Sequence, residues 1–260
     1  MTPTRAEKTQ PAPEIVQALT RLAPIDLSEM DSVSLMNRVD TKFVMAESTL
    51  LDLLDDAADD YRVLEVGGER LTRYSTLYFD TPALNCYFDH HNGKSIRRKF
   101  RMRAYGSSGA SFFEVKQRTN KGRTDKRRIP INAITSRLEG ESAALAEAIA
   151  GADLGLEARI WTEFSRITLV GRHAPERVTL DVDLQFRVGD RRVGLPGLVI
   201  AEVKQERDSR DSVVRRRLRE AGVRPLRVSK YCLGSILLDP ALKRNRFKPK
   251  LLAIQAYSPC

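Results

Sequence analysis

The sequence SIRRKFRMRAYGSSGASFFEVKQRTNKGRTDKRRIP, from Ser95 to Pro130, decides the fold, because it combines strand periodicity with an unusual density of cations. Together with Lys94 it holds thirteen basic and two acidic residues, an excess of eleven positive charges, while the whole chain has a formal net charge of +10. At a strand's period of two, four cations share one face: Arg97, Lys99, Arg101 and Arg103. The opposite face is mostly apolar.

Cations lined up on one strand face repel each other, and this segment has too few carboxylates to neutralise them. A bound anion with several charges is one interpretation of the pattern. A charged sheet face that is simply solvated is the other.

A second strand is predicted over residues 111–118, after a turn at Gly106–Gly109. In a hairpin, its Glu114 and Lys116 would lie beside the basic strand. The four residues Glu114-Val115-Lys116-Gln117 recur as Glu202-Val203-Lys204-Gln205, each time at the end of an apolar run. This repeat suggests two halves of one antiparallel sheet that place glutamate and lysine in related positions.

Composition describes an ordinary globular protein. The 260 residues are 42% hydrophobic and 30% charged, which suits one large domain or two small ones. No apolar run of about eighteen residues predicts a membrane span, and the N-terminus lacks the apolar core of a secretory signal, so we expect a cytoplasmic protein. The cysteines are interpreted as reduced thiols outside any disulfide framework or metal motif: Cys86, Cys232 and Cys260. The pI near 9.7 indicates polyanionic partners.

The chain divides into a flexible, proline-rich leader (1–13), a single domain (14–240) and a basic, loosely held tail (241–260). Alternating patterns predict further strands at 37–45, 71–79, 126–131, 164–170, 177–187 and 198–206. Leucine and alanine spacing predicts helices at 47–58, 136–150, 211–221 and 229–238. The fold class is therefore α+β. We expect the antiparallel sheet to close into a β-barrel with flanking helices, so that charged faces line the lumen.

Seven segments of the chain together resemble a known family. They are RVDTKF (38–43), YFDTPAL (78–84), RKFRMRAYG (98–106), FFEVKQR (112–118), LDVDLQF (180–186), IAEVKQE (200–206) and VSKY (228–231). Their order is similar to that of the VTC domain, the polyphosphate polymerase domain of the CYTH-like triphosphate tunnel metalloenzyme superfamily. The resemblance runs from about Arg38 to Leu238. It implies a barrel-shaped tunnel whose inner cations hold a triphosphate or phosphate chain, with a divalent metal held by acidic residues.

Site residues follow from the matched motifs. The resemblance implies phosphate binding by Lys42, Arg101, Arg103, Lys116, Lys126, Arg166, Arg177, Arg227, Ser229 and Lys230. Within this set it implies catalytic roles for Lys116, Arg101, Arg103 and Lys230. Glu202 matches the metal-binding glutamate. Ser229 is also interpretable as a helix N-cap that adds backbone N–H donors to the phosphate site.

Two departures refine this assignment. The opening Arg38-x-Asp40-x-Lys42 replaces the Glu-x-Glu-x-Lys of the adenylyl cyclase and thiamine triphosphatase branch, which favours the VTC branch. Arg227 stands where the family has lysine, which keeps the charge but changes the geometry.

The resemblance predicts transfer of the γ-phosphate of ATP to inorganic polyphosphate, with Mn²⁺ or Mg²⁺ as cofactor and no specific nucleic-acid partner. Three alternatives stay open: a tripolyphosphatase or nucleoside triphosphatase, a silent polyphosphate-binding module, and a nucleic-acid-binding protein. No Walker loop is present.

Several charged residues have structural interpretations beside the functional ones. Glu114 and Glu202 could merely form ion pairs with neighbouring cations. Asp181 and Asp183 are interpreted as ion-pair partners, with assistance to the metal as the alternative. His90 and His91 are predicted to lie solvated in a polar turn, without a catalytic role.

Overall fold

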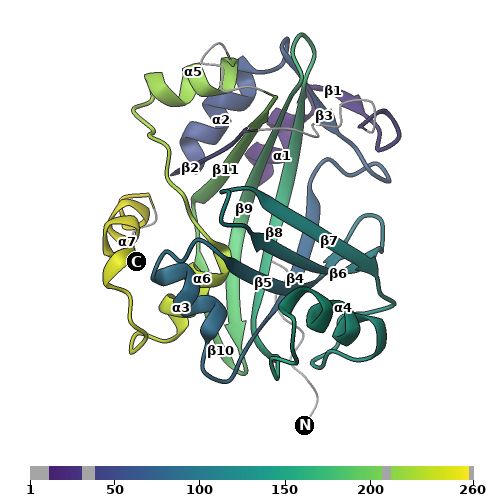
Figure 1. Ribbon diagram of the computed structural model, residues 1–260. Coiled ribbons are helices and arrows are strands. Elements are labelled where there is room, and N and C mark those ends of the chain that lie inside the picture. The colour runs from purple at the N-terminus through teal and green to yellow at the C-terminus, as the bar shows by residue number, and fades with distance from the viewer. Residues whose placement is uncertain (1–11, 31–38, 207–211, 258–260) are drawn as a thin grey trace.

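The computed structural model describes residues 12–30, 39–206 and 212–257. Most of the predicted leader, Arg38 and Cys260 lie outside these residues. The centre of the molecule is an eleven-stranded sheet that curls, so that β5, β6 and β7 run across the long strands β8 and β9 in Figure 1. The α+β class is confirmed, because helices lie along this predominantly antiparallel sheet.

The sheet follows the order β2-β11-β9-β8-β4-β5-β6-β7, and neighbours on this path are antiparallel. The path strands are β2 (Val39–Ala46), β4 (Thr72–Asp80), β5 (Arg97–Tyr105), β6 (Ser111–Arg118), β7 (Thr124–Pro130), β8 (Glu157–Gly171), β9 (Glu176–Val188) and β11 (Leu198–Gln205). Three short strands that the sequence patterns do not predict extend it: β1 (Ala23–Ile25), β3 (Tyr61–Leu64) and β10 (Arg191–Leu195).

The prediction of a closed barrel is wrong. The two ends of the path, β2 and β7, do not pair with each other among the described residues, so the sheet is curled and open. The free edge of β2 instead receives the segment before α6: the Leu226 N–H donates to the Lys42 carbonyl at 2.7 Å, and Phe43 bridges to Pro225. At Lys42 and Phe43 the edge of β2 is therefore covered and not open to another strand.

Helices cover the sheet in separate groups. Their bounds are α1 (Pro13–Leu19), α2 (Glu47–Asp56), α3 (Asn85–His91), α4 (Gly140–Ala150), α5 (Val213–Glu220), α6 (Lys230–Leu238), the 3-10 helix η2 (Asn245–Phe247) and α7 (Lys248–Gln255). Figure 1 shows α1, α2 and α5 at one end of the sheet, α3, α6 and α7 together lower down, and α4 beside β6. No helix in the described ranges combines the length and apolarity needed to cross a bilayer.

The apolar strand faces form the core under these helices. On β5 and β6, Phe100, Met102, Phe113 and Val115 pack with Ala146 of α4, so they occupy the face opposite the cations. On the other half of the sheet, Phe43, Leu180 and Val203 pack under α1, α2 and α5 in a second cluster. The charged faces predicted from the two-residue period therefore lie on the remaining, inner face of the curl.

Helix α6 packs against the inner face at one end of the sheet. A Cβ built on its Gly234 would lie 2.3 Å from Phe186 Cδ1 and 2.6 Å from Ile160 Cδ1, so only glycine fits this close approach. The Tyr231 hydroxyl donates to Asp80 Oδ2 at 2.5 Å. Asp80 also accepts backbone N–H groups from α3, which ties both helices to the end of β4.

A β-bulge interrupts β9. Glu163 pairs with Gln185 while Ser165 pairs with Val182, so Asp183 and Leu184 together face one residue of β8, and Asp183 has a φ of +53°. The alternating pattern over residues 177–187 predicts a strand correctly, but the side chains on each face exchange at the bulge. Up to Val182 its apolar side chains pack under α1 and α2, whereas beyond the bulge Leu184 and Phe186 pack with α6.

The C-terminal segment is held on the structure. Phe247 is 6% exposed and Ile254 3% exposed, and the Tyr87 hydroxyl donates to the Lys243 carbonyl at 2.9 Å. The expectation of a loosely held tail is therefore wrong, because apolar side chains of η2 and α7 complete the cluster around α6. The domain limits themselves stay a prediction.

Candidate functional site

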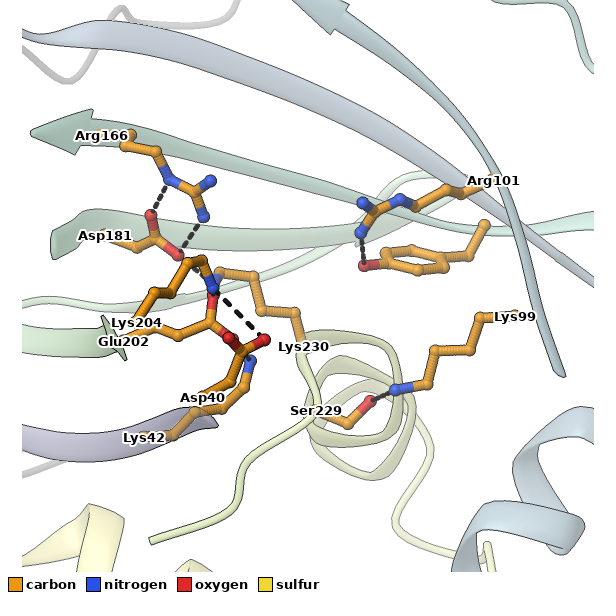
Figure 2. A network of polar contacts seen from close by, with 11 residues as sticks. Asp40, Lys42, Lys99, Arg101, Arg166, Asp181, Glu202, Lys204, Ser229 and Lys230 are labelled. Carbon is orange, nitrogen blue, oxygen red and sulfur yellow. Dashed lines mark hydrogen bonds and ion pairs between the residues drawn. The ribbon is translucent and has the colours of Figure 1, made fainter. Parts of the chain in front are cut away.

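The inner face of the curled sheet carries charged residues from β2, β11, β9, β8, β5, β6 and β7 and from the start of α6. Figure 2 shows part of this network. Most of the charges fall into three clusters: the Glu202 cluster (Asp40, Lys42, Glu202 and Lys204), the Glu114 cluster (Arg101, Glu114 and Lys126) and the Asp181 cluster (Arg166, Asp181 and Lys230).

The Glu202 cluster joins β2 to β11. Lys42 and Glu202 are direct cross-strand partners, with 3.1 Å between Lys42 Nζ and Glu202 Oε1. Lys204 forms an ion pair with Glu202 Oε2, and its Nζ lies 3.6 Å from Asp40 Oδ2. Burial alone would raise the pKa of Glu202, but the charges of Lys42 and Lys204 outweigh it and hold that pKa well below its ordinary value. The carboxylate is therefore ionised at neutral pH.

The Glu114 cluster lies in the other half of the sheet. The Glu114 side chain is fully buried, receives Arg101 Nε at 2.8 Å and Nη2 at 2.6 Å, and forms an ion pair with Lys126. The charges of Arg101, Arg103 and Lys126 overcome burial and lower the pKa of Glu114. Arg101 Nη1 also donates to the Tyr78 hydroxyl at 3.3 Å. Although burial opposes it, these guanidinium charges lower the pKa of Tyr78 to about 8.

The Asp181 cluster connects β8 and β9 to helix α6. Arg166 binds Asp181 with two hydrogen bonds, from Nε at 2.5 Å and from Nη2 at 2.9 Å, and Lys230 forms an ion pair with the same carboxylate. Lys230 Nζ also lies 4.6 Å from the centre of the Phe164 ring. Burial lowers the pKa of Lys230 to about 8, even though Asp181 acts in the opposite direction. The interpretation of Asp181 as an ion-pair partner is confirmed.

The N-terminus of α6 points toward these cations. Ser229 is the N-cap: its Oγ accepts the Cys232 N–H at 3.4 Å and also accepts a hydrogen bond from Lys99 Nζ at 2.9 Å, as Figure 2 shows for Lys99. A helix N-terminus adds partial positive charge and free N–H donors. The combination of Lys99, Ser229 and Lys230 therefore suits an anionic group.

Arg103 and Lys116 are among the inner-face cations that lack a carboxylate partner in the described part of the chain. Arg103 is 6% exposed, donates from Nε to Thr76 Oγ1 at 3.0 Å, and stacks over the Tyr74 ring at 5.3 Å. Lys116 has neither a hydrogen bond nor an ion pair there. The charge of Arg101, followed by burial, holds the pKa of Lys116 well below its ordinary value. The inner face therefore carries more positive charge than its own carboxylates neutralise.

The predicted site residues mostly converge. Nine of them lie together on the inner face or at the α6 terminus: Lys42, Arg101, Arg103, Lys116, Lys126, Arg166, Glu202, Ser229 and Lys230. Arg177 lies on the face of Thr179 and Asp181 and pairs in register with Lys204. Arg227 is exposed in the segment leading into α6. Their roles in binding and catalysis stay predictions.

Sequence reasoning left four neighbours of this site without a role. Lys99 was visible only as part of the basic strand, and Lys204 only as part of the repeated quartet. Asp40 appeared as a departure in a motif. Tyr78 begins the YFDTPAL segment but received no role, because its partner Arg101 is 23 positions away in sequence.

The two histidines are not solvated. Both belong to α3, where His91 is 2% exposed and its ring packs edge-on against Phe247, with 5.2 Å between ring centres. Burial and the surrounding cations lower the pKa of His90, which is therefore neutral. The predicted polar turn is wrong because apolar α7 and η2 residues cover this helix. Cys86 and Cys232 are buried free thiols, which agrees with their interpretation.

The donor set for a divalent metal is small but suitable. Among the described residues, no group of three His, Cys, Asp or Glu side chains could hold a metal ion by itself. The carboxylates of Glu202 and Asp40, however, both lie against the one ammonium of Lys204, which shows that this point favours positive charge. Mg²⁺ is commonly held by one or two carboxylates plus substrate phosphates. Glu202 and Asp40 fit an ion that completes its coordination with phosphate oxygens and water.

Known proteins resemble this chain in sequence pattern and in fold. The family model of the VTC domain matches residues 37–238. A putative adenylate cyclase from Bacillus halodurans has a similar fold, with 11% identity, a TM-score of 0.50, and coverage of 74% of this chain and 94% of that one. A putative adenylyl cyclase from Hippeastrum with a dominant triphosphatase activity gives 17% identity, a TM-score of 0.47, and coverage of 77% and 95%. No curated protein matches the chain.

Proposed function

Because the chain belongs to the VTC domain family, we propose that it transfers the γ-phosphate of ATP to a growing inorganic polyphosphate chain on the inner face of the curled sheet. Family membership supports a phosphoryl-transfer enzyme that acts on triphosphate or polyphosphate. One observation carries the proposal: the inner-face cations outnumber the carboxylates Asp40, Glu114, Asp181 and Glu202, and Lys116 and Arg103 have no carboxylate partner among the described residues.

In the proposed reaction, an oxygen of the terminal phosphate of the chain forms a new P–O bond to the γ-phosphorus of ATP, while the bond to the β–γ bridging oxygen breaks and ADP leaves. The protein needs to align the two phosphates and neutralise their repulsion, and no covalent intermediate is required. Arg101, Arg103 and Lys116 lie on adjacent strands and would bind the phosphate oxygens in the middle of the inner face.

Other groups complete the proposed alignment. Lys230 and the N–H groups at the start of α6 would hold a neighbouring phosphate at the end of the face. Glu202 and Asp40 would hold the divalent ion, which supplies charge neutralisation on the transferred phosphate. The low pKa of Glu202 keeps this ligand ionised at neutral pH.

Hydrolysis of a triphosphate is the second candidate, and the open sheet favours it. Strand β7 is exposed at nearly every position, and the Lys126 side chain is 37% exposed although it contacts buried Glu114. Water can approach the cations from this side, so it is a plausible acceptor for the same phosphate.

The test is incubation of the purified protein with ATP and Mn²⁺, followed by gel analysis for phosphate chains and a colorimetric assay for orthophosphate. Chains support the polymerase, and orthophosphate alone supports the hydrolase. Lys116→Ala is expected to lower turnover by about 100-fold or more. Lys121→Ala, which removes the same charge from the exposed turn after β6, is expected to stay within about twofold of the wild type.

Two outcomes would overturn the site. One is full activity of a variant that combines Lys116→Ala with Glu202→Ala. The other is equal loss in Lys116→Ala and Lys121→Ala. Arg101→Ala is a poorer probe, because it would leave the buried Glu114 carboxylate with one counter-ion fewer and so destabilise the fold.

A further inference from the structure

A second group of cations lies outside the three clusters, where β5 begins and β6 ends. Arg97 and Arg118 are direct cross-strand partners there, one step beyond the pair formed by Lys99 and Lys116. Two residues of a strand advance about 6.6–6.8 Å. The cations of the inner face therefore continue outward along β5 and β6 past the Ser229 end of α6.

Two further cations reach this place from distant parts of the chain. Lys99 binds Ser229, so the segment that carries Arg227, two residues earlier, lies beside the same end of β5. The second is Lys250 of α7, a helix that begins ten residues after the family match ends at residue 238. Arg246, just before α7, donates to the Asn92 carbonyl, so this segment is held beside the chain that leads into β5. We name Arg97, Arg118, Arg227 and Lys250 the rim cluster.

The rim cations lie within electrostatic reach of one another. Burial lowers the pKa of Arg97, and the charges of Arg118 and Arg227 lower it further. The pKa of Lys250 is lowered by burial and by the charges of Arg227 and Arg97. None of the four forms an ion pair within the described part of the chain. The nearby Asp89 pairs with Lys94 instead, with 2.7 Å between Asp89 Oδ1 and Lys94 Nζ. Repulsion among them is therefore left uncompensated.

Burial decreases steadily along this path. Arg103 and Arg101 are 6% and 8% exposed, Lys99 and Arg97 are half-buried, and Arg227 is exposed. A linear polyanion that occupies the inner face would thus pass the rim cluster as it enters solvent. Arg103 and Arg97 are six residues apart on β5, about 20 Å along the strand, so a triphosphate bound at Arg103 would be too short to reach the rim cluster.

We propose that the rim cluster is a second binding subsite, specific for polyphosphate chains longer than a triphosphate, and that α7 contributes to it through Lys250. This proposal rests on the proposed function, because it assumes that the inner face holds the first phosphates. The subsite would retain the chain between successive transfers, so its removal should shorten the products without abolishing transfer.

The test compares two probes by titration calorimetry: tripolyphosphate and a polyphosphate of several tens of phosphates. The variant is Arg97→Gln with Lys250→Gln, and the control is Lys243→Gln with Lys248→Gln, which removes two exposed cations from the same C-terminal segment. The rim variant is expected to lose about tenfold in long-chain affinity, to show a shallower salt dependence, and to keep its tripolyphosphate affinity within about twofold. The control is expected to lose about twofold at most.

Each other outcome is informative. If the wild type fails to bind tripolyphosphate, the proposed function fails. If it binds tripolyphosphate but the rim variant and the control behave alike, only the rim subsite fails. Equal losses for both probes in the rim variant, with an unchanged melting temperature, also overturn a separate subsite. Single-stranded DNA that competes as well as polyphosphate of equal charge would assign the rim to nucleic acid instead. The single Lys250→Gln variant repeats the test should the double variant fold poorly.

Discussion

The strands β6 and β11 contain the same four residues and occupy equivalent places, each next to the last strand at its end of the sheet path, yet they hold their glutamates differently. The Glu114 side chain is 0% exposed and bound by Arg101 and Lys126. The Glu202 side chain is 18% exposed, and its partner Lys42 is 35% exposed. An identical sequence thus yields a buried counter-ion in one half and an accessible carboxylate in the other.

In the two Glu-Val-Lys-Gln segments the lysines differ the other way round: the lysine of β11 is paired with carboxylates, and the lysine of β6, within the described ranges, is not. Lys204 has two carboxylates, Glu202 and Asp40, whereas Lys116 faces Lys99 and Lys126 in register. The neighbouring strand, and not the quartet itself, decides which glutamate and which lysine can interact with a ligand. We therefore propose that Glu202 and Lys116 contact the ligand and that Glu114 and Lys204 have structural roles.

The largest expected effect is on stability, from Glu114→Gln. This change leaves Arg101 and Lys126 without their carboxylate and should lower the free energy of unfolding by about 3–5 kcal/mol, measured by urea denaturation at pH 7. Glu202→Gln should cost about 1 kcal/mol or less, because its cluster is more exposed. Equal losses would contradict the distinction between the two halves.

The same pair of variants predicts how stability depends on pH. The folded-state pKa of Glu114 lies below its ordinary value of 4.5, so its contribution is present above that pH and is lost as the pH falls below it. The free energy of unfolding of the wild type should therefore fall as the pH drops below 4.5. Glu114→Gln should start from a lower free energy of unfolding but show a smaller fall over the same pH range. Denaturation curves from pH 3 to 7 provide the measurement.

For catalysis the order of the two glutamates should reverse. Glu202→Gln is expected to lower turnover of ATP by about 100-fold and to shift the requirement for Mn²⁺ to higher concentration, since it removes a proposed metal ligand. The readouts are the rate and the metal titration of the folded variant. A rate loss without any change in the metal titration would remove Glu202 from the metal site.

Substitution of the two lysines should also distinguish the two halves of the sheet, through smaller changes in the free energy of unfolding. Lys116→Met relieves repulsion and is expected to raise the free energy of unfolding by about 1 kcal/mol while weakening tripolyphosphate binding about tenfold. Lys204→Met removes the partner of Glu202 and should lower stability by about 1–2 kcal/mol. Parallel denaturation and calorimetry of both variants test this, and stability changes of the same sign would refute it.

The smallest effect concerns Lys230, which joins α6 to the inner face. Its pKa of about 8 means that its positive charge is lost as the pH rises through that value. Tripolyphosphate affinity should fall a few-fold between pH 7 and 9. Lys230→Arg, which stays charged, should flatten the decline measured by calorimetry.

The sequence predicted the strands of the main path and the direction of their charged residues, because a period of two fixes which side chains share a face. It could not predict closure, which depends on whether the edges of β2 and β7 meet. The contact of Leu226 with Lys42 that covers one edge joins residues 184 positions apart and leaves no local pattern. The matched motifs identified most of the site residues. The contacts of Tyr78 with Arg101 and of Lys99 with Ser229 depend on the packing of distant segments, which the motifs do not describe.

Segments outside the motifs were the least predictable. The burial of His91 and the docking of α7 depend on Phe247, a single aromatic residue in a basic stretch that composition alone describes as solvated. The bulge at Asp183 likewise leaves no trace in the alternating pattern, since the apolar residues on both sides of it keep their spacing.

The bulge at Asp183 lets one side of β9 contact two different environments, the charged network of the inner face and the apolar cluster around α6. Before Asp183, β9 turns Asp181 toward the charges, and after it the same side of the strand presents Leu184 and Phe186 as the seat of α6. If β9 paired regularly through Asp183 with no residue left over, Leu184 and Phe186 would turn to the opposite face, and α6, which carries Lys230, would lose its apolar contact with β9. The extra residue of the bulge, and not the spacing of the apolar side chains, therefore brings charged and apolar side chains onto one face of the same strand.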